Sequence, residues 1–273
     1  MSWHSLYLPS TESGSIAEYT RAVLVNLGYE PYDPFGLLPG KGYSRSVRLF
    51  VAPPDEGWTR LLGSIDETAL EPLLEALSQN GVCFSVHLEN EHAQFRAFAN
   101  GIEADFLEAL TPHLRADKTA DDLRRALSST TAAGSSIRAS ADAVEAPPEL
   151  LPNSVRQRAG SVNTRQVNKL FGRLMKQINR QTKGDEQAAR ALLAGDAPDW
   201  NSADGTRVRA VMACLPLTRW NQPDFVPLRD AYQLHVRRQR NPNAMLYPGD
   251  AEAMAAVPDA LRYTPIYVGK QVW

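Results

Sequence analysis

The 273-residue sequence has few cysteines and no long apolar run. Its two cysteines, Cys83 and Cys214, exclude a disulfide framework and a Cys-x-x-Cys zinc site, and we expect both thiols to pack in apolar surroundings. The longest apolar runs fall short of the roughly 18 residues that a membrane-spanning helix needs, so no membrane span is predicted. The first residues, Met1 to His4, lack the basic start and apolar run of a signal peptide. A cytoplasmic location is therefore the expectation.

Acidic side chains are absent between Glu149 and Asp185, a stretch of 35 residues. Residues 1–149 hold 11 Lys/Arg and 21 Asp/Glu, a net charge of −10, whereas residues 150–273 hold 18 and 10, a net of +8. This division of charge predicts that the two halves meet different partners, or each other.

The first half alternates between strand and helix patterns. Alternating or β-branched apolar residues predict strands, and apolar residues at helical spacing predict helices. The expected strands are 3–8, 46–52, 82–88 and 92–99, with 102–106 as a further candidate. The expected helices are 16–27, with Ser15 as N-cap, and 66–78, with Asp66 as N-cap. This order predicts an α+β fold: an N-terminal α/β-type domain with a small mixed or antiparallel sheet and two helices.

The second half is predicted to be mainly α-helical. The expected helices are 164–182, 185–194, 224–238 and 250–257, whereas 206–215 fits either a helix or a strand. A short helix at 116–127 and a segment rich in Ala, Ser and Pro connect the halves. The predicted organisation is an acidic α+β domain at 1–115, a linker at 116–162, and a basic, mainly helical domain at 163–273.

The helix expected at 164–182 has an apolar face and a separate basic face. A row of cations along one helical face can neutralise phosphates, because counterion release then supplies binding energy. Three further cations stand near the expected end of the helix at 224–238. The predicted polyanion site comprises Arg165, Lys169, Arg173, Lys176, Arg180, Lys183, Arg237, Arg238 and Arg240. The alternatives are a solvated face, docking onto the acidic half, or contact with an anionic membrane surface, and a domain core explains the apolar face more simply than a membrane.

The sequence signals for catalytic and metal-binding residues are weak. His87, Glu89, Glu91 and His92 gather imidazoles and carboxylates, but their spacing fits a charged hairpin turn rather than a metal site. No Gly-x-Ser-x-Gly motif or phosphate-binding glycine loop occurs. We therefore predict no catalytic residue, no metal and no cofactor.

Prolines and aromatic residues alternate in the segment 216–225. Such a segment can form the edge of a binding site, or its rings can pin an irregular stretch onto the core. The sequence favours the second interpretation and leaves the first open.

The leading hypothesis from the sequence is a non-enzymatic binding protein. Its basic helical domain would contact a polyanion, with nucleic acid as the first candidate. One alternative is a protein–protein interaction or assembly protein that uses its acidic and basic halves. The other is an enzyme whose site lies between the domains.

Overall fold

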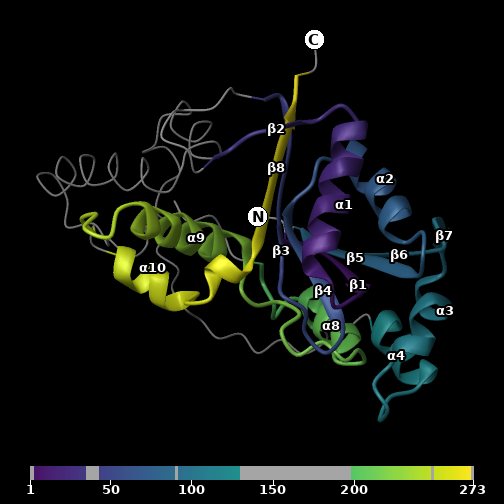
Figure 1. The fold of residues 1–273 in the computed structure, drawn as a ribbon. Helices are drawn as coiled ribbons and strands as arrows, with labels where there is room; N and C mark the ends of the chain where they lie inside the picture. The colour runs from purple at the N-terminus through teal and green to yellow at the C-terminus, as the bar shows by residue number, and fades with distance from the viewer. Residues whose placement is uncertain (1–2, 35–42, 90–91, 130–197, 247–248, 272–273) are drawn as a thin grey trace, which may run out of the picture. The chain divides into compact units, whose positions relative to one another are not determined.

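The computed structural model describes residues 3–34, 43–89, 92–129, 198–246 and 249–271 (Figure 1). Residues 2–130 and 200–273 belong to one compact unit, and the following paragraphs concern its described part. The helices expected at 164–182 and 185–194 lie outside the described residues. Within the described ranges, every helix is too short or too polar to cross a bilayer.

An antiparallel sheet of eight strands forms the centre of this unit. Its strands lie in the order β2-β8-β3-β4-β1-β5-β6-β7, and every pair is antiparallel. The strands are β1 (Trp3–Pro9), β2 (Glu30–Pro31), β3 (Arg45–Val51), β4 (Trp58–Ser64), β5 (Val82–Glu89), β6 (His92–Ala99), β7 (Ile102–Ala104) and β8 (Thr264–Lys270). Figure 1 shows β8, from the C-terminal end of the chain, running beside β3.

Helices cover both faces of the sheet. The helical elements are α1 (Ser13–Asn26), α2 (Glu67–Leu77), α3 (Phe106–Leu110), η1 (Thr111–His113), α4 (Ala120–Ser128), α8 (Ala203–Met212), α9 (Phe225–Arg240), α10 (Asp250–Ala256) and η3 (Ala260–Arg262). The helices α1 and α2 share one core with the sheet, which includes Leu6, Leu24 and Leu73. The opposite face carries two separate cores, one with α3, α4 and α8 and one with α9 and η3. Burial of these apolar faces is the main stabilising contribution.

Side chains on β1 alternate between the two faces, as they must in an extended strand. Leu6 and Leu8 belong to the core under α1 and α2. Trp3 and Tyr7 belong to the core under α8, and Ser5 lies between them on the strand. Because β4 is in register with β1, Tyr7 stands opposite Arg60. This pairing places the charged side chain of Arg60 on the sheet face that carries the two separate cores, one with α3, α4 and α8 and one with α9 and η3.

The α+β prediction is confirmed, and the sheet is antiparallel. The structure has strands at each of the expected positions 3–8, 46–52, 82–88 and 92–99. The expected continuation at 102–106 is a strand only over Ile102–Ala104. Asp66 caps α2 as expected, because its side chain accepts a hydrogen bond from the backbone N–H of Thr68 at 2.9 Å.

The predicted start of the first helix is wrong. The helix α1 begins at Ser13, and its N-cap Glu12 makes no capping bond through its side chain. The backbone N–H of Ile16 donates to the carbonyl oxygen of Glu12 at 3.1 Å, so helical bonding is already established there. Ser15 lies inside the first turn, and its hydroxyl donates to the Glu12 carboxylate at 3.2 Å.

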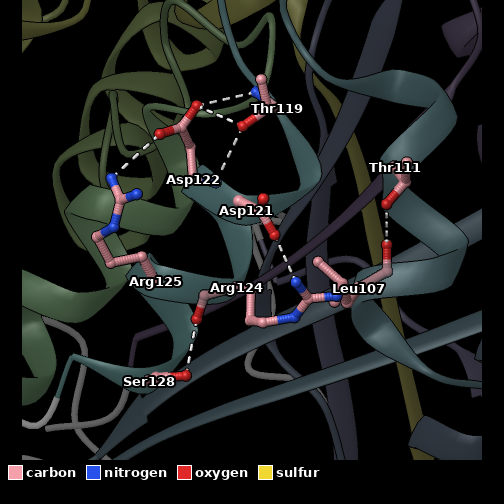
Figure 2. A network of polar contacts seen from close by, with 8 residues as sticks. All are labelled: Leu107, Thr111, Thr119, Asp121, Asp122, Arg124, Arg125 and Ser128. Carbon is pink, nitrogen blue, oxygen red and sulfur yellow. Dashed lines mark hydrogen bonds and ion pairs between the residues drawn. The ribbon is translucent and has the colours of Figure 1, made fainter.

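The helix expected at 116–127 begins later, at Ala120, because Thr119 forms a capping box. The Thr119 hydroxyl accepts from the backbone N–H of Asp122 at 3.3 Å, and the Asp122 carboxylate accepts from the backbone N–H of Thr119 at 3.0 Å. Figure 2 shows this box with the exposed pairs that Arg124 and Arg125 form one turn along. The capping bonds of α4 are thus formed between Thr119 and Asp122 at its own N-terminus.

Residues from the second half of the chain join the sheet and its helices. The stretch 206–215, whose pattern fitted either a helix or a strand, lies mostly in the helix α8. Asp224 caps α9 as expected. The tail after residue 257, for which no helix or strand was predicted, supplies β8. The boundaries at 115 and 163 stay predictions, since most of the expected linker 116–162 lies outside the described residues.

Candidate functional site

Arg60 on β4 is a buried cation, with 6% of its surface exposed. Its Nε donates to Oγ of Ser5 at 2.9 Å, and its Nη1 donates to the carbonyl oxygen of Pro223 at 3.1 Å. Its guanidinium carbon lies 5.6 Å from the centre of the Trp3 ring system. Its third nitrogen, Nη2, has no hydrogen-bond partner within the described part of the chain. A buried guanidinium with an unmatched donor is a costly arrangement.

Arg60 keeps its positive charge in this position. Burial lowers its pKa, and the negative charge of Asp224 is among the effects that oppose the lowering. A guanidinium starts from so high a pKa that it is not deprotonated in proteins. The site therefore holds a permanent positive charge that is largely removed from bulk water, where an anion would interact more strongly with it than at the surface.

A cavity of about 300 Å³ lies beside Arg60. Tyr7 and Arg60 contribute to it from the sheet, and the turn before β4 contributes Asp55 and Trp58. The segment 217–222 lines it, as do Arg262 and Tyr263 after α10. The cavity thus lies where the segment between α8 and α9 crosses the sheet.

Asp55 fixes the segment that lines the cavity. Its carboxylate accepts from the backbone N–H of Thr218 at 3.1 Å, from the Thr218 hydroxyl at 2.7 Å, and from the backbone N–H of Arg219 at 2.9 Å. A carboxylate with these donors is already satisfied, so its negative charge is largely balanced locally. Asp55 therefore positions the segment rather than offering a base to a ligand.

Tyr7 and Trp220 hold the same segment at its other end. The Tyr7 hydroxyl donates to the carbonyl oxygen of Trp220. Burial raises the pKa of Tyr7 to about 12, so the hydroxyl stays protonated at neutral pH. The Trp220 ring packs edge-on against Trp3 and Trp200, with centroid distances of 5.8 and 5.2 Å. Both interpretations of the stretch 216–225 thus have support in the structure, because its aromatic residues pack and its backbone lines a cavity.

Three of the four charged residues in the lining of the cavity are cationic. The lining includes Arg60, Arg219 and Arg262 and a single carboxylate, that of Asp55. Arg219 is 69% exposed and forms a loose pair with Asp259, with Nη1 and Oδ2 3.9 Å apart. Arg262 is exposed. Among the described lining residues there is no histidine or cysteine to act as base or nucleophile. Guanidinium groups in this arrangement are suited to holding an anion.

A larger cavity of about 460 Å³ lies beside the same segment. Glu56, Arg115 and mainly apolar residues of 212–220 line it. Its two charged residues are of opposite sign. Within the described ranges, none of its lining residues has a buried side-chain donor or acceptor that lacks a partner. We therefore regard the smaller, arginine-lined cavity as the candidate site despite the difference in volume.

The cations predicted from sequence lie elsewhere. Arg237, Arg238 and Arg240 occupy the last turn of α9, away from the lining of the cavity. The Nη2 of Arg237 donates to the carbonyl oxygen of Met245 at 3.0 Å, and the Nη2 of Arg240 lies 3.9 Å from Oδ2 of Asp33. The remaining predicted residues lie outside the described part of the chain: Arg165, Lys169, Arg173, Lys176, Arg180 and Lys183.

Two of the four histidines in the first half, His4 and His87, form a pair in which His4 is buried and His87 is half-buried. The rings of His4 and His87 lie 5.0 Å apart on neighbouring strands. Burial, and then the charge of His87, lower the pKa of His4 to about 3. In the ranges that the structure describes, no three histidine, cysteine or acidic side chains are grouped as metal ligands.

Arg60 was missed because β4 was not predicted, whereas the segment 216–225 was named as a possible edge of a binding site. The signal was present in the run Trp58-Thr59-Arg60-Leu61-Leu62, where an arginine interrupts an otherwise apolar strand. An arginine in such a position is either paired or functional, because charged side chains are rarely buried otherwise.

Comparison with known proteins identifies no relative of this chain. No protein-family model matches it, and neither curated proteins nor solved structures give a significant match. The function must be argued from the geometry of the site.

Proposed function

We propose that this protein is a non-enzymatic binding protein for an anionic partner, whose acidic group contacts Arg60. The observation that carries the proposal is the Nη2 of Arg60, a buried donor without a partner in the described part of the chain, next to a cavity. An incoming oxyanion would satisfy this donor and balance the buried charge. The exposed arginines 219 and 262 would attract the anion toward the cavity.

Nucleic acid is the anionic partner that the sequence favours. The carboxylate-free stretch 150–184 holds eight basic residues and extends the cationic character beyond the cavity. When both sets of cations neutralise phosphates on a nucleic-acid strand, the counterions condensed on that strand are released into solution, so the affinity must fall as salt rises. The three arginines in the lining of the cavity support this role.

A salt titration of the full chain tests this function. We expect fluorescently labelled single-stranded and duplex oligonucleotides to bind at low salt, with the logarithm of affinity falling linearly against the logarithm of salt concentration. Arg60→Met should weaken binding, whereas Arg124→Gln, on the far exposed face of α4, should not. No binding at low salt, or an affinity that ignores salt, would rule the proposal out.

A second candidate is assembly through the acidic and basic halves. Its support is that Asp33 and Asp55 of the first half contact Arg240 and the Thr218–Arg219 backbone of the second. If such contacts also form between chains, the full-length protein should associate at low salt and dissociate at high salt. Sedimentation equilibrium at both salt concentrations measures this, and a monomer throughout excludes assembly.

A further inference from the structure

We infer that the cavity beside Arg60 receives the terminal phosphate monoester of a nucleic-acid strand rather than its internal phosphodiesters. This inference rests on the proposed function and specifies which chemical group occupies the site. It follows from the depth of Arg60, the size of the cavity and the charge of its lining.

The burial of Arg60 limits what can reach it. Only 6% of the residue is exposed, and its neighbour Tyr7 lies on the adjacent strand of the sheet, so an anion must enter the cavity to contact the guanidinium. An internal phosphodiester is flanked by a sugar on both sides, and both sugars would have to enter with it. A terminal phosphate has one sugar and can enter first.

The size of the cavity supports the same conclusion. Its volume of about 300 Å³ is at the small end of ligand sites, which span roughly 300–1,000 Å³. Tyr7 and Arg60 of the sheet line one part of it, and Asp55 fixes Thr218 and Arg219 in the segment that lines another part. A terminal phosphate fits a cavity of this size, whereas a continuous nucleic-acid strand would need a groove that is open at both ends.

The charge of the lining favours a monoester over a diester. A phosphate monoester carries a charge of about −1.5 to −2 at neutral pH and offers three terminal oxygens, whereas each internal phosphate of a nucleic acid carries a single charge. The lining offers guanidinium groups from Arg60, Arg219 and Arg262, whose fork geometry suits phosphate oxygens. The unmatched Nη2 of Arg60 supplies the innermost donor.

Two oligonucleotides of the same sequence test the inference, one with a 5′-phosphate and one with a 5′-hydroxyl, each labelled at the 3′ end. Fluorescence anisotropy with the full chain should show about tenfold tighter binding of the phosphorylated strand, as expected for an additional charge-assisted contact. Millimolar inorganic phosphate should lower the affinity for the phosphorylated strand to that for the hydroxyl strand. The affinity for the hydroxyl strand should not change. Tryptophan fluorescence gives a second readout, since Trp58 and Trp220 line the cavity.

Variants locate the preference. Arg60→Met and the double variant Arg219→Gln/Arg262→Gln should each bind both strands alike, and Arg124→Gln should keep the tenfold difference. The double variant changes exposed or largely exposed side chains, so it tests the inference even if Arg60→Met does not fold. A preference that survives in the double variant overturns the inference.

The outcomes separate this inference from the function on which it rests. Equal affinity of the wild-type chain for both strands overturns the terminal-phosphate assignment and leaves nucleic-acid binding intact. Binding of neither strand removes both. Two results with inorganic phosphate also overturn the assignment. In one it displaces neither strand, and in the other it displaces both strands equally. In either case the protein has no site that is specific for a terminal phosphate.

The pH dependence offers one more discriminating measurement. The second pKa of a phosphate monoester is about 6. Lowering the pH from 7.5 to 5.5 should therefore reduce the preference for the phosphorylated strand, while the hydroxyl strand, whose phosphodiesters keep their charge, changes less. A preference that stays constant over this range contradicts the monoester assignment.

Discussion

His4 and Arg60 are both buried basic side chains on neighbouring strands, but they lie on opposite faces of the sheet. They are 9% and 6% exposed, respectively. Arg60 donates to Ser5 and to the carbonyl oxygen of Pro223. The ring of His4 lies beside that of His87, and its Nε2 has no hydrogen-bond partner in the described ranges.

The difference follows from the chemistry of the two groups. A histidine can lose its proton, and burial makes His4 neutral by lowering its pKa to about 3. An arginine cannot, so its charge must be matched by acceptors or by a ligand. On one face of the sheet, the buried imidazole of His4 is therefore neutral. On the other face, the guanidinium of Arg60 stays charged, and hydrogen bonds satisfy only part of it. Four measurements test this comparison.

The largest expected effect is an acid-dependent loss of stability caused by His4. Its folded pKa of about 3 lies below the ordinary histidine value of 6.5, so the unfolded chain binds more protons between these pH values. The stabilising contribution is complete above pH 6.5 and is lost progressively as the pH falls toward 3. It should amount to about 3 kcal/mol by pH 4.

Urea unfolding at pH 7 and pH 4 measures this loss. His4→Gln should lose about 3 kcal/mol less than the wild type between the two pH values, since it has no imidazole to protonate. The lowered pKa of His87 leaves a smaller dependence of the same sign in the variant. Identical pH dependence in both proteins would contradict a buried neutral His4.

The next effect comes from the acceptor of Arg60. Ser5→Ala removes the hydroxyl that accepts from Nε, and leaves a second buried guanidinium donor unmatched. The free energy of unfolding should fall by about 2 kcal/mol, the typical contribution of a hydrogen bond to a charged group. Ser10→Ala, which removes an exposed acceptor of the backbone N–H of Glu12, should cost less than about 0.5 kcal/mol. Equal losses would indicate that Arg60 does not depend on Ser5.

Tyr7→Phe should have a moderate effect. It removes the bond to the Trp220 carbonyl but keeps the ring, which stacks on Phe84 at 4.9 Å. The expected loss is about 1 kcal/mol. Tyr19→Phe is the matched control, because Tyr19 is 47% exposed and its hydroxyl reaches the Ala76 carbonyl at 3.3 Å. Thermal unfolding of both variants should separate them, and a larger loss from Tyr19→Phe would refute the role assigned to Tyr7.

The smallest effect has the opposite sign. Thr20 of α1 is fully buried on the side of His4, and its hydroxyl has no hydrogen-bond partner among the residues described. Thr20→Val replaces this hydroxyl with a methyl group of similar shape and should stabilise the protein by up to about 1 kcal/mol. Chemical denaturation measures the change, and a clear loss of stability would show that the hydroxyl has a partner.

Local signals in the sequence were sufficient for some elements. Asp66 and the leucines after it identify α2, because an N-cap and an apolar stripe involve only neighbouring residues. Trp58–Ser64 was missed because Arg60 interrupts its apolar pattern and Gly63 is an uncommon strand residue. A side chain at Gly63 is excluded, because a Cβ there would lie 2.0 Å from the carbonyl oxygen of Arg48.

The candidate site could not be assembled from the sequence alone. Tyr7, Arg60 and Trp220 come from segments far apart in the chain and meet only through the pairing of β1 with β4 and the crossing of the segment before α9. The strand β8 was missed for a similar reason. Pro265 and Gly269 weaken its pattern, and its strand conformation depends on its partners β2 and β3.

The position of β8 has a consequence for synthesis of the protein. This strand fills the space between β2 and β3, yet the ribosome must make the whole of 52–263 after β3 before it makes β8. Until then the hydrogen-bonding edge of β3 is open in the nascent chain, and open edges recruit other strands. Closure of so distant a pairing is also slow. Newly made chains should therefore aggregate more readily than refolded protein at the same concentration, and a chaperone that shields β3 should improve the yield.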